Sequence, residues 1–155
     1  MPRKSEIGEG NELDDILRRL DASKAAFVKA LEGSDPDRFA ERGPDGESAR
    51  SATQRASDEI NFYYGKLVAT ALNLPQPPGL ARADFGSLRE AVAALQLAHR
   101  SFTNLLHDLV TEDLAKIAKD PELGTYSLKQ LLELASAQYT MRAQQVDRLA
   151  AAPSG

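Results

Sequence analysis

Four polar side chains in two segments of helical periodicity have the types and the spacing of a binding site. Arg55 and Glu59 lie four residues apart, and so do Gln138 and Arg142. Side chains at this spacing share one face of a helix, and the apolar residues around the second pair mark that face as the inner one. Large polar groups that point inward need partners. Glu59 could accept paired hydrogen bonds from either arginine, and Gln138 would complete the network.

Two interpretations of this polar cluster stay open. It could be a buried salt-bridge network that fixes the register of the helices and binds nothing. It could instead be a cationic pocket between helices that binds a small anion, such as a carboxylate. Tyrosine hydroxyls could contribute to such a pocket, although an aromatic side chain at helical spacing first of all fills a core. The four tyrosines that could contribute are Tyr63, Tyr64, Tyr126 and Tyr139, and we include Tyr63 among the candidate ligand-binding residues.

Histidine offers little further chemistry, because the chain has only two histidines. His107 falls off the apolar stripe of its segment, whereas His99 lies on the stripe and is expected to point inward. We expect His99 either as a hydrogen-bonded core residue or as a member of the polar cluster. The spacings of a di-iron site are absent, as are cysteine, the nucleophile-elbow motif and the glycine-rich phosphate loops.

The overall composition is that of a soluble single domain. The chain has 155 residues, 42% of them hydrophobic, and a formal net charge of −4. A nucleic-acid-binding protein usually shows a basic face, whereas here charges of both signs are mixed along every segment. No apolar run approaches the roughly 18 residues that a membrane span needs, and the first ten residues lack the apolar region of a secretion signal. We therefore expect a cytoplasmic protein that binds neither nucleic acid nor membranes.

Four long segments repeat their apolar residues every three or four positions, which predicts four amphipathic helices. Asn11 is the expected cap of the first helix. Capping boxes that begin at Ser87 and Ser127 open the third and fourth helices. The predicted helices span residues 12–32, 47–73, 88–109 and 128–149, with short helical turns near 36–39 and 111–117 and a proline-rich linker at 74–86.

No segment shows the alternation of a β-strand, so the sequence predicts an all-α fold. Four helices with one long connection predict a four-helix bundle with a crossover between the second and third helices. Residues 11–150 form the predicted single domain. Residues 1–10 and 151–155 are expected to be flexible tails.

Three segments carry a resemblance to a known family that covers roughly residues 11–149. They are Leu-Glu-Gly-Ser-Asp-Pro-Asp-Arg-Phe ending at Phe39, Gly-Glu-Ser-Ala-Arg-Ser-Ala beginning at Gly46, and Thr-Tyr-Ser-Leu-Lys-Gln-Leu-Leu-Glu beginning at Thr125. In this layout the chain resembles the DinB-like superfamily of helical bundles, whose relatives include bacillithiol- and mycothiol-dependent transferases. The resemblance implies one divalent metal ion, held by one histidine of the second helix and two of the fourth.

The chain departs from the family at the implied metal site. The three ligand positions fall near Arg55, Gln138 and Arg142. A guanidinium cannot lose its proton to bind a cation, and an amide is a poor ligand for a transition metal. We therefore expect a protein without metal or other cofactor, in which guanidinium charges replace the charge of the metal.

Three functions remain open at this stage. The first is a metal-free, non-catalytic DinB-like bundle that binds a small anionic molecule among Arg55, Glu59, Tyr63, His99, Gln138 and Arg142. The second is a homodimeric structural or interaction module, since small bundles of this family commonly pair. The third is a metal-dependent thiol transferase or hydrolase that uses His99, Glu59 and a tyrosine as ligands, although one inward histidine is few for a transition metal.

Overall fold

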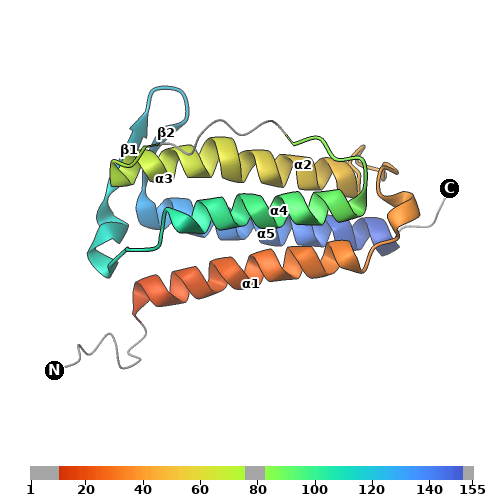
Figure 1. The fold of residues 1–155 in the computed structure, drawn as a ribbon, viewed down its shortest axis with the longest axis horizontal. Helices are drawn as coiled ribbons and strands as arrows, with labels where there is room; N and C mark the ends of the chain where they lie inside the picture. Colours follow the sequence, from red (N-terminus) through yellow and green to blue (C-terminus); the bar gives the residue numbers. More distant parts are fainter. Residues whose placement is uncertain (1–10, 76–82, 152–155) are drawn as a thin grey trace.

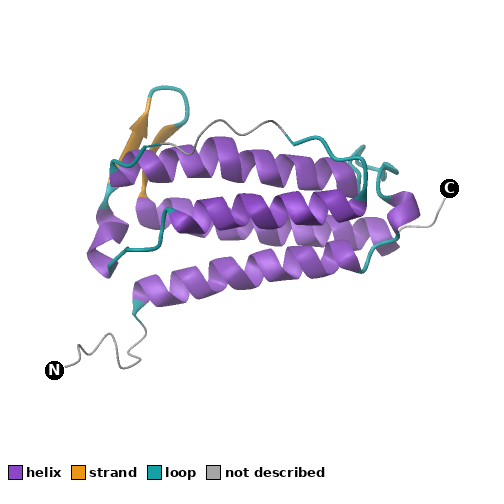
Figure 2. Cartoon of the chain, in the orientation of Figure 1, coloured by secondary structure: helices purple, strands orange, loops and turns teal. Residues whose placement is uncertain are grey.

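The computed structural model describes residues 11–75 and 83–151. The predicted tails lie outside these residues, apart from Ala151, which ends a helix. Figure 2 shows that the described chain is mainly helical, with one small two-stranded sheet. The helices are α1 (Glu12–Glu32), α2 (Ala49–Glu59), α3 (Gly65–Leu72), α4 (Leu88–Asn104) and α5 (Leu128–Ala151), and the strands are β1 (Ile117–Asp120) and β2 (Gly124–Ser127).

Four helical rods lie side by side, because α2 and α3 continue one another in a single rod (Figure 1). α1 and α5 run in one direction, and the α2–α3 rod and α4 run in the other. An ion pair of 2.9 Å between Glu12 and Lys129 joins the first turns of α1 and α5, as their parallel course requires. Since the α2–α3 rod and α4 are parallel, the end of α3 and the start of α4 lie at opposite ends of the molecule. Residues 76–82 of the predicted crossover lie outside the described residues.

The predicted apolar stripes form the core between the rods. Leu20 of α1, Leu67 of α3, Leu95 of α4 and Leu131 of α5 are all buried there. Each helix buries one stripe and keeps a polar face outside, which is how amphipathic helices assemble. No helix within residues 11–75 and 83–151 has both the length and the apolar character that crossing a membrane would require.

The helix starts follow from capping side chains. Ser87 and Ser127 each accept a hydrogen bond from the backbone N–H three residues on, at 3.2 and 3.1 Å. The predicted box is complete at α5, where the Ser127 N–H donates to Gln130 Oε1 (2.8 Å), whereas at α4 the Glu90 carboxylate accepts from the Gly86 N–H (3.1 Å) and not from the Ser87 N–H. The second helix begins at Ala49 and not at residue 47, because Ser48 is its cap. The Ser51 N–H donates to Ser48 Oγ (3.0 Å) and the Ser48 N–H donates to Ser51 Oγ (2.8 Å), which closes a reciprocal box.

A π turn, Ile60–Tyr64, joins α2 to α3 inside the segment that we predicted as one regular helix. Its hydrogen bond runs from the Gly65 N–H to the Ile60 carbonyl, five residues back. A Cβ atom at Gly65 would lie 2.7 Å from that carbonyl oxygen, so the close approach depends on glycine. The extra residue turns the faces of α2 relative to α3, and such turns often occur at functional sites.

Two other predictions of local structure were wrong. The third helix ends at Asn104 and not at residue 109, because the backbone changes to bonds that span three residues, from Leu105 to Phe102 and from Leu106 to Thr103. The periodicity nevertheless continues, and Leu106 is buried. After a 3₁₀ turn at Thr111–Ala115, the chain forms a hairpin in which β1 pairs with β2, although no strand was expected.

Candidate functional site between α2 and α5

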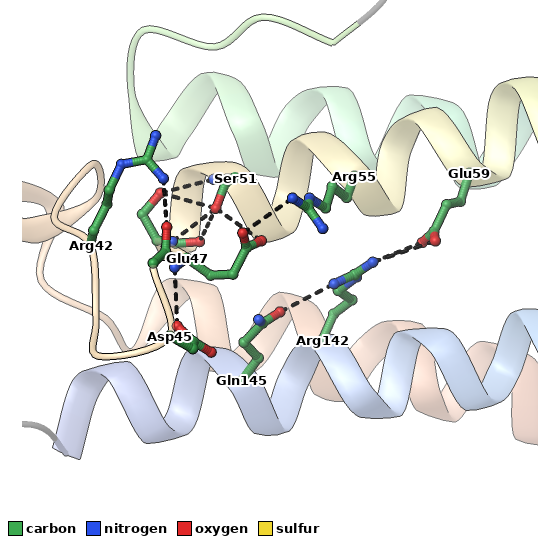
Figure 3. Close-up of polar contacts among 10 residues, drawn as sticks. Arg42, Asp45, Glu47, Ser51, Arg55, Glu59, Arg142 and Gln145 are labelled. Atoms are coloured by element: carbon green, nitrogen blue, oxygen red, sulfur yellow. Dashed lines mark hydrogen bonds and ion pairs between the residues drawn. The ribbon is translucent and has the colours of Figure 1, made fainter.

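The Glu59–Arg142 ion pair joins the end of α2 to the middle of α5 (Figure 3). It is one of the two pairings of Glu59 that the spacing of the polar residues had left open. Arg142 Nη2 lies 3.4 Å from each carboxylate oxygen of Glu59, and Nη1 donates to Gln145 Oε1 at 3.3 Å. Arg142 is only 7% exposed, whereas the Glu59 side chain is 32% exposed. One guanidinium therefore lies in the interior with a half-exposed carboxylate as its counter-ion.

The pairing of Arg142 is incomplete. Its Nε atom is buried and has no hydrogen-bond partner among the residues that the structure describes, and the same holds for Gln138 Oε1. An unpaired buried donor or acceptor costs about 1–3 kcal/mol. The prediction that Gln138 completes the network was therefore wrong for its carbonyl oxygen. The Nε donor of Arg142 and the Oε1 acceptor of Gln138, one turn before it on α5, thus make no hydrogen bond within the described residues.

Arg55 does not share the interior with Arg142. Its Nη2 atom lies 3.2 Å from a carboxylate oxygen of Glu47, and its side chain is 61% exposed. Glu47 lies two residues before the start of α2 at Ala49, and from there its side chain can extend to Arg55. Figure 3 shows the two arginines engaging different carboxylates. The expectation of two inward guanidinium groups was wrong, because only Arg142 of these two arginines is buried.

Three tyrosines extend the polar region along the rod. Tyr63 and Tyr126 share a hydrogen bond of 3.0 Å between their hydroxyl groups. This bond, with burial as a second cause, raises the pKa of Tyr63 to about 12. Burial raises the pKa of Tyr64 above its ordinary value, and the negative charge of Glu59 adds to the effect. Tyr63 and Tyr64 are thus kept neutral, and Tyr63 uses its hydroxyl on Tyr126, not on Arg142.

His99 belongs to a second polar network, on the other side of the core. Its Nε2 atom lies 3.1 Å from Asp21 Oδ1 of α1, and its Nδ1 atom lies 3.0 Å from the Tyr139 hydroxyl of α5. Burial lowers the pKa of His99, against the opposing effect of its hydrogen bond to Asp21. In the described part of the chain, no hydrogen bond or ion pair joins His99 to Glu59 or Arg142. Its alternative assignment as a core residue is the one that the structure supports.

The described residues do not offer a metal site. Within residues 11–75 and 83–151, no three His, Cys, Asp or Glu side chains lie close enough together to hold a metal ion. The proposed ligand set of His99, Glu59 and a tyrosine is divided between two networks. A guanidinium at the centre of the α2–α5 site would repel a cation.

Two hollows in the described structure lie away from the candidate residues. One, of about 750 Å³, is lined by the end of α5 and by residues after α1, including Arg38 and Leu149. The other, of about 760 Å³, lies between residues near Phe39 and the start of α4. None of the six candidate residues lines either hollow. The Glu59–Arg142 pair therefore lies outside both hollows.

Two residues of these networks were missed from the sequence. Gln145 lies three residues after Arg142, and this spacing could have identified it as a neighbour on the same helix. Asp21 lies on a different helix from His99, and no spacing within one segment reports such a contact. Known proteins add no further assignment, because the chain matches no family model, no curated protein and no solved structure.

Proposed function

We propose that the protein is a DinB-like four-helix bundle that works without a metal ion and binds a small molecule through its carboxylate. Arg142 is the binding residue in this proposal, with Glu59 as the counter-ion that the ligand displaces. The observation that carries it is that Arg142 is 7% exposed and that its buried Nε donor has no partner among the described residues. A guanidinium fork matches the two oxygens of a carboxylate, which makes carboxylates its preferred ligands.

The course of the rods supports the DinB-like part of the proposal. The sequence predicts a long crossover after the second helix, and the resemblance implies a site between the second and fourth helices. The α2–α3 rod and α4 run parallel, and Arg142 meets Glu59 between α2 and α5. Since a guanidinium binds carboxylates but activates no water as a metal ion does, the proposal is for a binding protein and not for a hydrolase or transferase.

Thermal denaturation of the full chain with acetate, phosphate and a small thiol tests the proposal. A ligand present at a hundred times its dissociation constant stabilises the folded state by about 2.7 kcal/mol. We expect acetate to raise the melting temperature of the wild type and to lose this effect in Arg142→Met. The matched control is Arg55→Met, because Arg55 lies at the surface, and it should respond to acetate as the wild type does. If no carboxylate stabilises the wild type, the proposal is wrong.

Elemental analysis of the purified protein tests the metal-free part of the proposal. Stoichiometric zinc or nickel that survives dialysis would contradict it. Homodimer formation stays a prediction of its own. It concerns exposed helix faces and does not depend on Arg142.

A further inference from the structure

The α2–α5 site carries one positive and one negative group whose contact is loose. Both oxygens of Glu59 share the single nitrogen Nη2 of Arg142, each at 3.4 Å. Charge-assisted hydrogen bonds between such groups are usually about 2.7–2.9 Å long. A guanidinium can donate five hydrogen bonds, and here Nε has no partner among the described residues. Both ions therefore keep capacity for a ligand that separates them.

The charge of Glu59 restricts which ligands can do so. A simple anion that binds Arg142 must stay close to the Glu59 carboxylate, and the repulsion between like charges is stronger in a partly buried site than in water. A zwitterion avoids this cost. Its carboxylate can take the place of Glu59 on Arg142, while its cationic group gives Glu59 a new partner.

Gln138 supplies a second acceptor for the cationic group. It lies one turn before Arg142 on the same face of α5, and its Oε1 atom is buried without a partner in the described residues. An ammonium has three donors and no acceptor. Glu59 and Gln138 can accept two of them while Arg142 donates to a carboxylate. This set of donors and acceptors is complementary to the headgroup of an α-amino acid.

Apolar side chains flank the site on the same helix. Leu134 lies four residues before Gln138 and Met141 three residues after it, and they are 38% and 43% exposed. Their spacing places both on the side of α5 that Gln138 occupies. An aliphatic ligand side chain that covers them would bury apolar surface and strengthen binding.

We infer that the site formed by Glu59, Gln138 and Arg142 binds an α-amino acid with an aliphatic side chain. The carboxylate binds to Arg142, and the ammonium binds to Glu59 and Gln138. This inference rests on the carboxylate-binding function proposed above. It adds the ammonium group and the aliphatic side chain to the description of the ligand.

Three matched compounds test the inference by isothermal titration calorimetry on the full chain. They are L-leucine, 4-methylpentanoate, which lacks the ammonium, and 3-methylbutylamine, which lacks the carboxylate. A hydrogen bond to a charged group is worth enough that its loss weakens binding about tenfold or more. We expect leucine to bind and each of the other two compounds to bind at least tenfold more weakly.

Glu59→Gln changes this order in a way that a nonspecific site would not. The variant keeps the shape of the side chain and removes the charge that holds the ammonium and repels the anion. Leucine should bind more weakly than to the wild type, and 4-methylpentanoate more tightly. Glu47→Gln is the matched control, because Glu47 pairs with the surface residue Arg55, and it should leave both affinities unchanged.

The possible outcomes separate the two proposals. If 4-methylpentanoate binds the wild type as tightly as leucine, the amino-acid inference is overturned and carboxylate binding stands. If neither compound binds, both proposals fail, and a water molecule between Arg142 Nε and Gln138 Oε1 in a crystal grown with leucine would show the reason. The comparison of ligands on the wild type decides the question even where Glu59→Gln does not fold.

Discussion

Removing the hydroxyl group of Tyr139 should destabilise the protein out of proportion to the size of the change. Tyr139 is 1% exposed, and its hydroxyl lies 3.0 Å from His99 Nδ1. An ionised Asp21 can only accept, so neutral His99 donates from Nε2 and accepts at Nδ1 from Tyr139. Tyr139→Phe keeps the ring in the core and leaves Nδ1 buried without its donor. The expected loss is about 1–3 kcal/mol of the free energy of unfolding.

Urea denaturation at pH 7.5, followed by circular dichroism, measures this loss. In a domain of this size each kcal/mol lowers the melting temperature by about 2–4 °C. Tyr63→Phe is the matched control, because the Tyr63–Tyr126 hydrogen bond is only partly buried and water can replace it. We expect this control to lose less than about 1 kcal/mol. Equal stabilities of Tyr139→Phe and the wild type would refute the assignment of the buried bond.

The burial of His99 gives the protein a dependence on pH. Burial lowers the pKa of His99 below its ordinary value of 6.5. The unfolded chain therefore takes up a proton near pH 6.5, whereas the folded chain takes it up only at lower pH. Stability is complete above pH 6.5 and falls as the pH drops toward the folded-state pKa. His99→Gln should flatten the curve in this range, and unchanged curvature would contradict the role of His99.

Three further predictions concern other parts of the molecule. Glu59→Ala leaves the buried Arg142 guanidinium without its carboxylate and should cost about 1–3 kcal/mol, whereas Asp84→Ala, which removes an 86% exposed carboxylate from its pair with Arg50, should cost less than about 1 kcal/mol; equal losses in urea denaturation would contradict the difference in burial between the two ion pairs. Gly65→Ala places a Cβ atom 2.7 Å from the Ile60 carbonyl oxygen and should cost about 1–3 kcal/mol, and a variant with unchanged stability would show that the π turn can relax. Sedimentation velocity should detect a homodimer at high concentration, and a monomer throughout would refute the predicted pairing.

Most of the helical structure could be predicted from the sequence, because periodicity and caps are local signals. Asn11, Ser87 and Ser127 cap helices where the sequence placed them. The hairpin was missed because its strands have four residues each, too few for alternation to show. The sequence nevertheless contains turn residues between the strands, Asp120, Pro121 and Gly124. In the structure, Asp120 accepts hydrogen bonds from the N–H groups of Glu122 and Leu123.

The sequence predicted only those features of the candidate site that depend on residue spacing within a single helix. Spacing identified the faces of α2 and α5 and offered Arg55 and Arg142 as alternative partners of Glu59. Spacing could not predict that Arg55 pairs with Glu47, because this pairing depends on where α2 begins. Nor could it separate the His99 network from the Arg142 site, because which inward faces meet depends on the packing of the rods.

The proposed replacement of a metal ion by Arg142 changes what such a site can do. A metal ion and a guanidinium both attract a carboxylate, but only the metal can bind and acidify a water molecule. A guanidinium also needs no cage of ligands, so a single carboxylate can balance it. Glu59 provides that balance at 3.4 Å, which leaves the site without net charge. A neutral site of this kind favours a ligand that carries both charges, and this is why the affinity of leucine relative to 4-methylpentanoate is the measurement on which the proposed mechanism depends.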